Sequence, residues 1–286
     1  MGGVQLNILY PNDTIIINKQ KYTVLKKRGE GSFGKVYVIK RNSDGMKFIL
    51  KITENNYHGK NELDIMKRLS FYPDCNPCIV CLYDYEIAKD FIYLLMEYKI
   101  GSDMEEFLNN YKVKLYKRKF FIVKDLELFN KWFYQAIAGL CYMHKLGIIH
   151  LDIKPRNILI DLNRDLKFID FGLSTQYKKD KFIDSFNGTE CYNEPYLNSA
   201  CFYTDIYALG VTFTSMFLKP TADLCNTSLI SNVIDTIQFP SKYKYYKTLL
   251  REMTKVTKDR PSAQEILDFL KSNGTKPLVI EDYKKC

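Results

Sequence analysis

The chain has 286 residues, of which 46% are hydrophobic and 26% are charged. That composition is ordinary for a globular protein, and the length is enough for one large domain or two lobes. No apolar run is as long as a transmembrane helix, and no basic segment followed by an apolar core opens the chain. We therefore expect neither a membrane span nor a signal peptide, and place the protein inside the cell, in the cytoplasm, the nucleus or both.

The formal net charge is +9, and lysine and arginine cluster at residues 112–119, 178–181 and 242–247. A basic surface favours anionic partners such as acidic protein segments, nucleic acid or a membrane face. The alternative is a solvated surface that binds nothing specific, and the composition leaves both open.

Three of the eight cysteines, Cys75, Cys78 and Cys81, stand at a regular spacing. Such a spacing can hold a metal ion, but no second cluster of cysteine or histidine completes a set of four ligands. We expect free thiols in a reducing compartment, with a metal site as the alternative.

The first part of the chain predicts β-strands around a glycine-rich turn. Residues 14–17 are typical of one extra strand, and strands at 22–28 and 37–40 flank the pattern Gly-x-Gly-x-x-Gly-x-Val at 29–36. No helical pattern follows the glycines, so the segment predicts a hairpin and not a dinucleotide-binding turn, which requires a helix at the third glycine. Glycines in such a hairpin let backbone amides approach phosphate oxygens.

Further elements follow in chain order. Residues 48–51 and 91–96 are apolar segments typical of strands, and residues 60–69 have apolar side chains at the spacing of a helix. Asp103 precedes another predicted helix, where its carboxylate would either cap that helix or reach the ribose or a substrate. Residues 126–146 then predict a long helix.

The most informative stretch is the sequence HLDIKPRN at residues 150–157. Apolar segments on both sides predict strand, loop and strand, so the chain would turn back and bring Asp152, Asn157 and Asp170 close together. Two carboxylates and an amide oxygen suit a hard divalent cation such as Mg²⁺, which prefers oxygen ligands. Asp152 would then be placed to accept a proton from an attacking hydroxyl.

This stretch and the Asp-Phe-Gly that follows it resemble the catalytic loop and the metal-binding turn of eukaryotic-type protein kinases. The resemblance implies that Asp152 is the catalytic base and that Lys154 stabilises the transferring phosphoryl group. It implies that Asn157 and Asp170 hold Mg²⁺ or Mn²⁺.

The resemblance also implies the fold class. We expect an α+β, bilobal protein kinase-like fold, with a small β-rich N-lobe at 1–97 and a larger, mostly helical C-lobe at 98–286. Together the lobes would form one protein kinase domain of about 22–270.

A binding site for ATP follows from the same resemblance. Lys51 would anchor the phosphates and pair with Glu62 on the next helix, and Met96 would close the back of the pocket. Ile49 stands where relatives have a small alanine, which should tighten the pocket and reduce ordinary ATP affinity. The backbone at the end of the strand 91–96 would meet the adenine edge. The expected nucleotide-binding residues are Gly29, Gly31, Gly34, Val36, Lys51, Glu62, Met96, Glu97, Lys99 and Leu159.

The later part of the chain resembles the substrate-positioning loop of serine/threonine kinases at Gly188 and Thr189. Thr189 would bridge Asp152 and Lys154, and with Lys154 it indicates serine/threonine specificity. Asp205 would brace the backbone of the catalytic loop.

Two departures from the family pattern are visible. Leu151 replaces the arginine that usually precedes the catalytic aspartate, so the pocket for an activation-loop phosphate is incomplete and we expect activity without such phosphorylation. Residues 194–196 read Glu-Pro-Tyr where Ala-Pro-Glu is usual, which leaves the partner of Arg260 open between Glu194 and another group.

The resulting prediction is a serine/threonine protein kinase that transfers the γ-phosphate of ATP to Ser or Thr of protein substrates. The alternatives are a pseudokinase or scaffold that binds anionic partners through its basic surface, and a small-molecule kinase. Arg156 favours acidic substrates, whereas Asp103, Glu105 and Glu106 favour basic ones. The chain also resembles compact kinases of large DNA viruses, of the baculovirus type, which would suggest a basic DNA-packaging substrate, and this conflict stays open.

Overall fold

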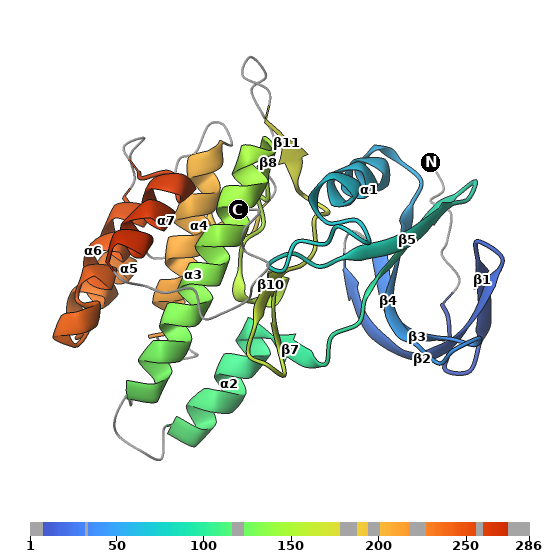
Figure 1. Ribbon diagram of the computed structural model, residues 1–286, viewed down its shortest axis with the longest axis horizontal. Helices are drawn as coiled ribbons and strands as arrows, with labels where there is room; N and C mark the ends of the chain where they lie inside the picture. Colours follow the sequence, from blue (N-terminus) through green and yellow to red (C-terminus); the bar gives the residue numbers. More distant parts are fainter. Residues whose placement is uncertain are drawn as a thin grey trace. The chain divides into compact units, whose positions relative to one another are not determined.

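A computed structural model describes most of the chain, and it divides into two compact units, Met1–Ile100 and Gly101–Cys286 (Figure 1). The described residues are 8–31, 34–115, 123–177, 188–193, 201–217, 227–255 and 260–273. The two units are described separately.

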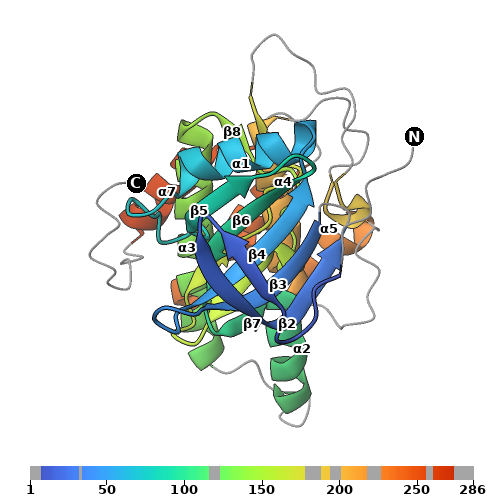
Figure 2. The same cartoon turned by 90° about the vertical axis from the view of Figure 1, so that its right-hand side faces the viewer.

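The first unit is an antiparallel sheet of six strands in the order β1-β2-β3-β4-β6-β5, and helix α1 lies against β4 and β6 (Figure 2). The strands and the helix predicted from the sequence are all present, including the extra strand at 14–17. The elements are β1 (Thr14–Ile17), β2 (Gln20–Gly31), β3 (Gly34–Arg41), β4 (Lys47–Glu54), α1 (Tyr57–Leu69), β5 (Leu82–Ile87) and β6 (Phe91–Glu97).

One buried apolar cluster of this unit lies on a single face of the sheet because side chains alternate between the two faces of a strand. Val24 on β2, Ile39 on β3 and Leu50 on β4 belong to one buried apolar cluster. The alternation sends Ile49 and Lys51, the neighbours of Leu50, to the opposite face, where the predicted nucleotide site would lie.

The extra strand β1 has a role that the sequence did not predict. In the turn after β1, Asn18 donates its side-chain amide to Asp84 Oδ1 and to the carbonyl oxygen of Tyr85, both at 2.9 Å. Its backbone N–H donates to Glu86 Oε2 at 2.6 Å. These bonds tie the β1–β2 turn to β5 at the other edge, so the sheet is curled.

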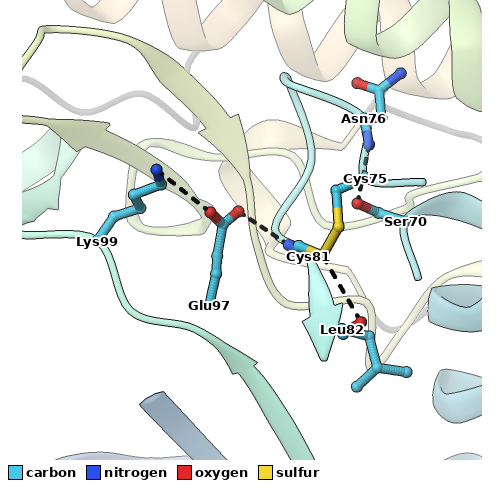
Figure 3. Close-up of a disulfide and its surroundings, with 7 residues drawn as sticks. All are labelled: Ser70, Cys75, Asn76, Cys81, Leu82, Glu97 and Lys99. Carbon is cyan, nitrogen blue, oxygen red and sulfur yellow. Dashed lines mark hydrogen bonds and ion pairs between the residues drawn. A yellow bond between two sulfur atoms is a disulfide. The ribbon is translucent and has the colours of Figure 1, made fainter. Parts of the chain in front are cut away.

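A disulfide joins Cys75 and Cys81 in the segment between α1 and β5 (Figure 3). The expectation of free thiols is therefore wrong for these two residues, and the metal alternative loses two of its three ligands. The chain turns back on itself between the two cysteines, which brings their Cα atoms to 5.4 Å, within the range that a disulfide spans. Cys78, Cys141 and Cys201 remain thiols.

The second unit is mostly helical, with short strands that hold the loops of the candidate site (Figure 1). The predicted long helix is α3, which packs against α7 and α4. Its helices are α2 (Met104–Leu115), α3 (Val123–Lys145), α4 (Phe202–Ser215), α5 (Thr227–Thr236), α6 (Tyr245–Met253) and α7 (Ala263–Ser272). Its strands are β7 (Gly101–Asp103), β8 (Ile148–Ile149), β9 (Ile158–Asp161), β10 (Leu166–Phe168) and β11 (Thr175–Gln176).

Aromatic side chains fill the core between α3, α4 and α6. Phe133 on α3 lies edge-on to Phe213 on α4 and to Tyr246 on α6, with ring centroids 4.9 and 5.0 Å away. Such aromatic pairs add stability beyond their buried area and fix the helices that carry the loops. Across the described ranges, no helix combines the length and the apolar character needed to span a membrane.

Candidate active site

A buried ion pair in the first unit confirms the predicted contact between Lys51 and Glu62. Lys51 Nζ lies 2.5 Å from Glu62 Oε1, and the two residues are only 5% and 2% exposed. Two charges removed from water are tolerated when each neutralises the other. The pair therefore holds an ammonium group at a fixed place on the face of β4 opposite the cluster that contains Leu50.

The short connection between β4 and α1 positions Glu62. The side chain of Asn56 caps α1 by accepting from the backbone N–H of Gly59 at 3.0 Å. A Cβ on Gly59 would lie 2.2 Å from the carbonyl oxygen of Glu54, so only glycine allows the helix to start this close to the strand. Glu62 then falls on the buried side of α1.

Strand register brings several predicted nucleotide-binding residues onto one face of the sheet. Val36 stands opposite Lys51, and Ile49 stands opposite Met96. Ile49, the departure from the usual alanine, therefore sits beside Met96 on the sheet face that would meet the nucleotide.

The glycine hairpin is formed by Gly29, Gly31 and Gly34, whose connecting residues 32–33 lie outside the described part. Gly34 requires glycine, because its φ is +128° and a Cβ would lie 2.2 Å from the carbonyl oxygen of Ile52. Gly29 and Gly31 border open space. Because glycine has no side chain, a ligand can come close to the backbone at these two positions.

At the end of β6, Glu97 is held by the segment that contains the disulfide. Glu97 and Cys81 exchange two hydrogen bonds: Glu97 N donates to the Cys81 carbonyl oxygen, and Cys81 N donates to Glu97 Oε1, both at 2.9 Å. Lys99 Nζ lies 3.7 Å from the other carboxylate oxygen, Oε2 (Figure 3). The side chain of Glu97 is thus engaged within its own unit.

The second unit assembles Asp152, Lys154, Thr189 and Asn157 into one hydrogen-bonded network, as predicted for the first three. Lys154 Nζ lies 2.9 Å from Asp152 Oδ2 and donates to Thr189 Oγ1 at 2.7 Å. Thr189 Oγ1 donates to Asp152 Oδ1 at 2.8 Å. Asn157 Nδ2 donates to Asp152 Oδ2 at 2.7 Å. The carboxylate of Asp152 is therefore oriented from three sides.

The predicted turn-back of the chain is confirmed by β9 and β10, which pair antiparallel with Phe168 opposite Ile158. Ile169 N donates to the Asn157 carbonyl oxygen at 3.0 Å, so Asn157 and Asp170 are brought together across the end of the hairpin. Leu159 stands on β9, partly buried, between β10 and β7.

The donor set at this end of the hairpin fits a hard divalent cation. The amide nitrogen of Asn157 is engaged by Asp152, which leaves its amide oxygen as the ligand atom, and Asp170 contributes a carboxylate. Asp170 has a φ of 63°, and its Oδ1 accepts from Gly172 N at 3.4 Å. Oxygen ligands of this kind are those that Mg²⁺ and Mn²⁺ take.

Asp205 holds the backbone of the catalytic loop at residues 150–151, as predicted. Its buried carboxylate accepts from the backbone N–H groups of His150 and Leu151, both at 2.9 Å. The backbone of Leu151 has a φ of 66°, which an L-residue adopts only when its surroundings hold it there. Asp205 supplies that restraint one residue before Asp152.

The two histidines near Asp205 are structural. His144 Nε2 lies 3.0 Å from Asp205 Oδ2, a contact that no spacing in the sequence indicated. Burial lowers the pKa of His150, against the opposing effect of nearby carboxylates led by Asp205, so its imidazole is neutral near pH 7. His150 Nδ1 accepts from Asp152 N at 3.3 Å.

The structure shows part of the environment of Arg260, whose partner the sequence leaves open. Arg260 donates to the carbonyl oxygens of Lys255 and Tyr203, at 2.6 and 3.0 Å, so backbone groups are among its partners. Glu194, the other candidate partner, lies outside the described residues. Ser174 is 1% exposed and donates to the His150 carbonyl oxygen at 3.0 Å, which makes it a structural hydroxyl.

Comparisons with known proteins agree on one family. The family model described as "Protein kinase domain" matches residues 22–272. The human protein "NUAK family SNF1-like kinase 1" is 28% identical over 262 residues, which cover 86% of this chain and 37% of the relative. The "Probable serine/threonine-protein kinase KIN1 homolog" of Enterocytozoon bieneusi is 28% identical over 271 residues, covering 93% and 42%. The "Carbon catabolite-derepressing protein kinase" of Saccharomyces cerevisiae is 29% identical over 205 residues, covering 69% and 31%.

This chain spans about two fifths of the length of the first two of these relatives, as the coverages of 37% and 42% state. The three named relatives come from cellular organisms. They give no support to the resemblance to viral kinases.

Proposed function

We propose that this chain, which belongs to the protein kinase family, is a serine/threonine protein kinase that transfers the γ-phosphate of ATP to Ser or Thr hydroxyls of protein substrates. Its fold is the predicted α+β protein kinase fold, with a curled antiparallel sheet followed by a mostly helical region. The observation that carries the proposal is the network of Asp152, Lys154 and Thr189.

The network suits the acceptor side of phosphoryl transfer. Asp152 would orient the incoming hydroxyl and accept its proton as the bond to phosphorus forms. Lys154, held by both Asp152 and Thr189, would stabilise the negative charge on the transferring phosphoryl group. The reaction needs little covalent help from the protein, so positioning and charge stabilisation account for most of the rate.

The nucleotide side would be served by the first unit. Lys51, fixed by Glu62, would bind phosphate oxygens, and the glycine hairpin would offer backbone N–H groups to them. Val36, Ile49 and Met96 would pack on the adenine ring. Asn157 and Asp170 would hold Mg²⁺ or Mn²⁺, which when bound neutralises charge on the phosphates.

The remaining assignments follow from the family. ATP and a Ser/Thr-containing protein would be the partners, inside the cell, where such kinases act. An additional anionic partner would need the basic clusters, of which 178–181 lies outside the described residues and 112–119 has no described side chains. In the cluster 242–247, Lys247 Nζ already donates to the Asp235 carbonyl oxygen at 2.5 Å.

The test is transfer of radiolabelled phosphate from ATP and Mg²⁺ to two protein mixtures, one acidic and one rich in Arg and Ser. The wild type should label at least one mixture, and Asp152→Asn should not. Asp90→Asn, which removes an exposed carboxylate of the first unit, is the matched control and should label like the wild type. Labelling by Asp152→Asn at the wild-type level, or no labelling by any variant, would replace the kinase proposal with a scaffold that binds without catalysis.

A further inference from the structure

The segment between α1 and β5 follows the helix that carries Glu62, and its Cys81 is hydrogen-bonded to Glu97 at the end of β6. Both of its ends are tied by backbone hydrogen bonds: Leu82 N donates to the Ser70 carbonyl oxygen at 2.8 Å, and Tyr72 N donates to the Leu82 carbonyl oxygen at 2.9 Å. Within it, the Cys75–Cys81 disulfide closes a loop whose cysteines are six positions apart. The segment is therefore fixed at its base and again by a covalent bond.

The disulfide is directly coupled to the end of β6. Cys81 uses both its backbone N–H and its carbonyl oxygen to bind Glu97. Figure 3 shows Glu97 between Cys81 on one side and Lys99 on the other. The two residues assigned to the adenine edge, Glu97 and Lys99, thus depend for their position on a residue that is itself in the disulfide. Opening the disulfide removes the covalent restraint on Cys81 and leaves only its hydrogen bonds.

The disulfide is also accessible from one side. Cys75 is partly exposed, whereas Cys81 is 2% exposed and the thiol of Cys78 is 0% exposed. The disulfide is therefore approached from solvent more easily on the Cys75 side than on the Cys81 side. In proteins inside the cell, disulfides are usually transient and serve catalysis or redox sensing, so a structural staple is not the expected use of this one.

We infer that Cys75–Cys81 is a redox switch that acts on nucleotide binding. The inference rests on the proposed function, since it takes the backbone of Glu97 and Lys99 to meet the adenine edge, as the resemblance to protein kinases implies. The oxidised form holds Cys81, and through it Glu97, in the position for ATP. The reduced form lets the segment move, so ATP must then order it on binding and binds more weakly.

The chemistry is ordinary thiol–disulfide exchange with a dithiol reductant. One reductant thiolate attacks the Cys75 sulfur, forming a mixed disulfide while Cys81 leaves as a thiolate and takes a proton. The second reductant thiol then attacks the mixed disulfide and releases Cys75 as a thiol. Two electrons and two protons pass from the reductant, which becomes a cyclic disulfide.

The experiment measures the Kd for ATP of the full chain, oxidised and after treatment with dithiothreitol, with the state of Cys75 and Cys81 followed by peptide mass spectrometry. Reduction should raise the Kd by roughly two- to tenfold, the equivalent of one hydrogen bond lost from the bound state. Reoxidation should restore it. The variant Cys75→Ser/Cys81→Ser should show the Kd of the reduced wild type and no response to dithiothreitol, whereas Cys201→Ser should respond like the wild type.

Each other result has a defined meaning. If mass spectrometry shows that the disulfide is open and the Kd for ATP is nevertheless unchanged, the switch is overturned and the kinase proposal stands. A response to dithiothreitol that persists in Cys75→Ser/Cys81→Ser would place it at other cysteines and also overturn the switch. The switch would also be overturned if Cys75 and Cys81 were both found as thiols in the oxidised protein. Absence of ATP binding in both redox states would instead remove the proposed function on which the inference rests.

Discussion

Replacing Asp205 with alanine should be among the most destabilising single changes in the second unit. The carboxylate is 0% exposed and accepts from the backbone N–H groups of His150 and Leu151, each at 2.9 Å. Alanine leaves both buried donors without an acceptor, and each unsatisfied donor costs about 1–3 kcal/mol. The free energy of unfolding should therefore fall by about 2–6 kcal/mol. In Asp205→Asn, which has one acceptor oxygen instead of two, the free energy of unfolding should fall by roughly half as much.

Catalysis should fall further than stability alone explains. Without Asp205, nothing among these contacts holds Leu151 at its φ of 66°, and relaxation of that residue would turn Asp152 away from Lys154 and Thr189. We expect kcat of the folded Asp205→Asn variant to drop by at least an order of magnitude, roughly the effect of misplacing a catalytic group by an ångström.

The assay is urea unfolding compared through the midpoint and slope, together with phosphate transfer measured where the variant is fully folded. Asp268→Asn is the control, since Asp268 is exposed and accepts from Gln264 at 2.8 Å, and it should change stability by less than about 0.5 kcal/mol. An Asp205→Ala protein within about 1 kcal/mol of the wild type would refute the reasoning that these two donors depend on this acceptor.

Three further predictions follow from the two units. Lys51→Met and Glu62→Gln should each lower the free energy of unfolding by about 3–5 kcal/mol because a buried charge loses its partner. The double variant should lose less than the sum of the two. Additive losses in urea unfolding would show that the two side chains do not interact. His150 is buried neutral with a lowered pKa, so the stability it contributes is complete above pH 6.5, the usual unfolded value, and is lost as the pH falls through that value. An NMR titration that placed the pKa of His150 at or above 6.5 would be inconsistent with this. Gly34→Ala should destabilise the hairpin by about 1–3 kcal/mol through strain at its positive φ, whereas Gly31→Ala should have a much smaller effect, and equal thermal midpoints for the two would reject the explanation.

Local patterns were enough to predict most of the fold. The apolar segment at 48–51 and the helical spacing at 60–69 placed β4 and α1, because each pattern depends on neighbours a few residues apart. The apolar segments after the motif at 150–157 also carried their own geometry, since they pair as β9 and β10 and bring Asn157 and Asp170 to the same end of a hairpin.

The contacts that the sequence missed join residues far apart in the chain. Asn18 meets Asp84 and Glu86 across the curled sheet, and no pattern near Asn18 indicates a partner there. The disulfide was missed for a different reason. Spacing alone cannot distinguish two cysteines brought together by a turn from two that point apart, so the cellular compartment decided the prediction.

Substrate charge preference shows how pairing changes a conclusion drawn from counting charges. In the sequence, Arg156 favoured acidic substrates, whereas Asp103, just before α2, and Glu105 and Glu106 in its first turn favoured basic ones. In the structure Arg156 Nε donates to Glu105 Oε2 at 2.5 Å, and Asp103 accepts from Glu106 N at 2.8 Å as the cap of α2. Arg156 and Glu105 thus neutralise each other beside the catalytic loop. Neither argument from the sequence counted this pairing.

Glu105→Gln should therefore release the charge of Arg156 without unfolding the protein. The side chains of Arg156 and Glu105 are 70% and 39% exposed, and exposed ion pairs contribute only about 0–1 kcal/mol to stability. A freed guanidinium near an acidic substrate side chain is worth about 1 kcal/mol in water, which corresponds to about fivefold in relative kcat/KM for acidic over neutral peptides. Arg156→Gln, with Glu105 freed instead, should shift the preference toward basic peptides. If both variants kept the wild-type ratio, the Arg156–Glu105 pair would not face the substrate.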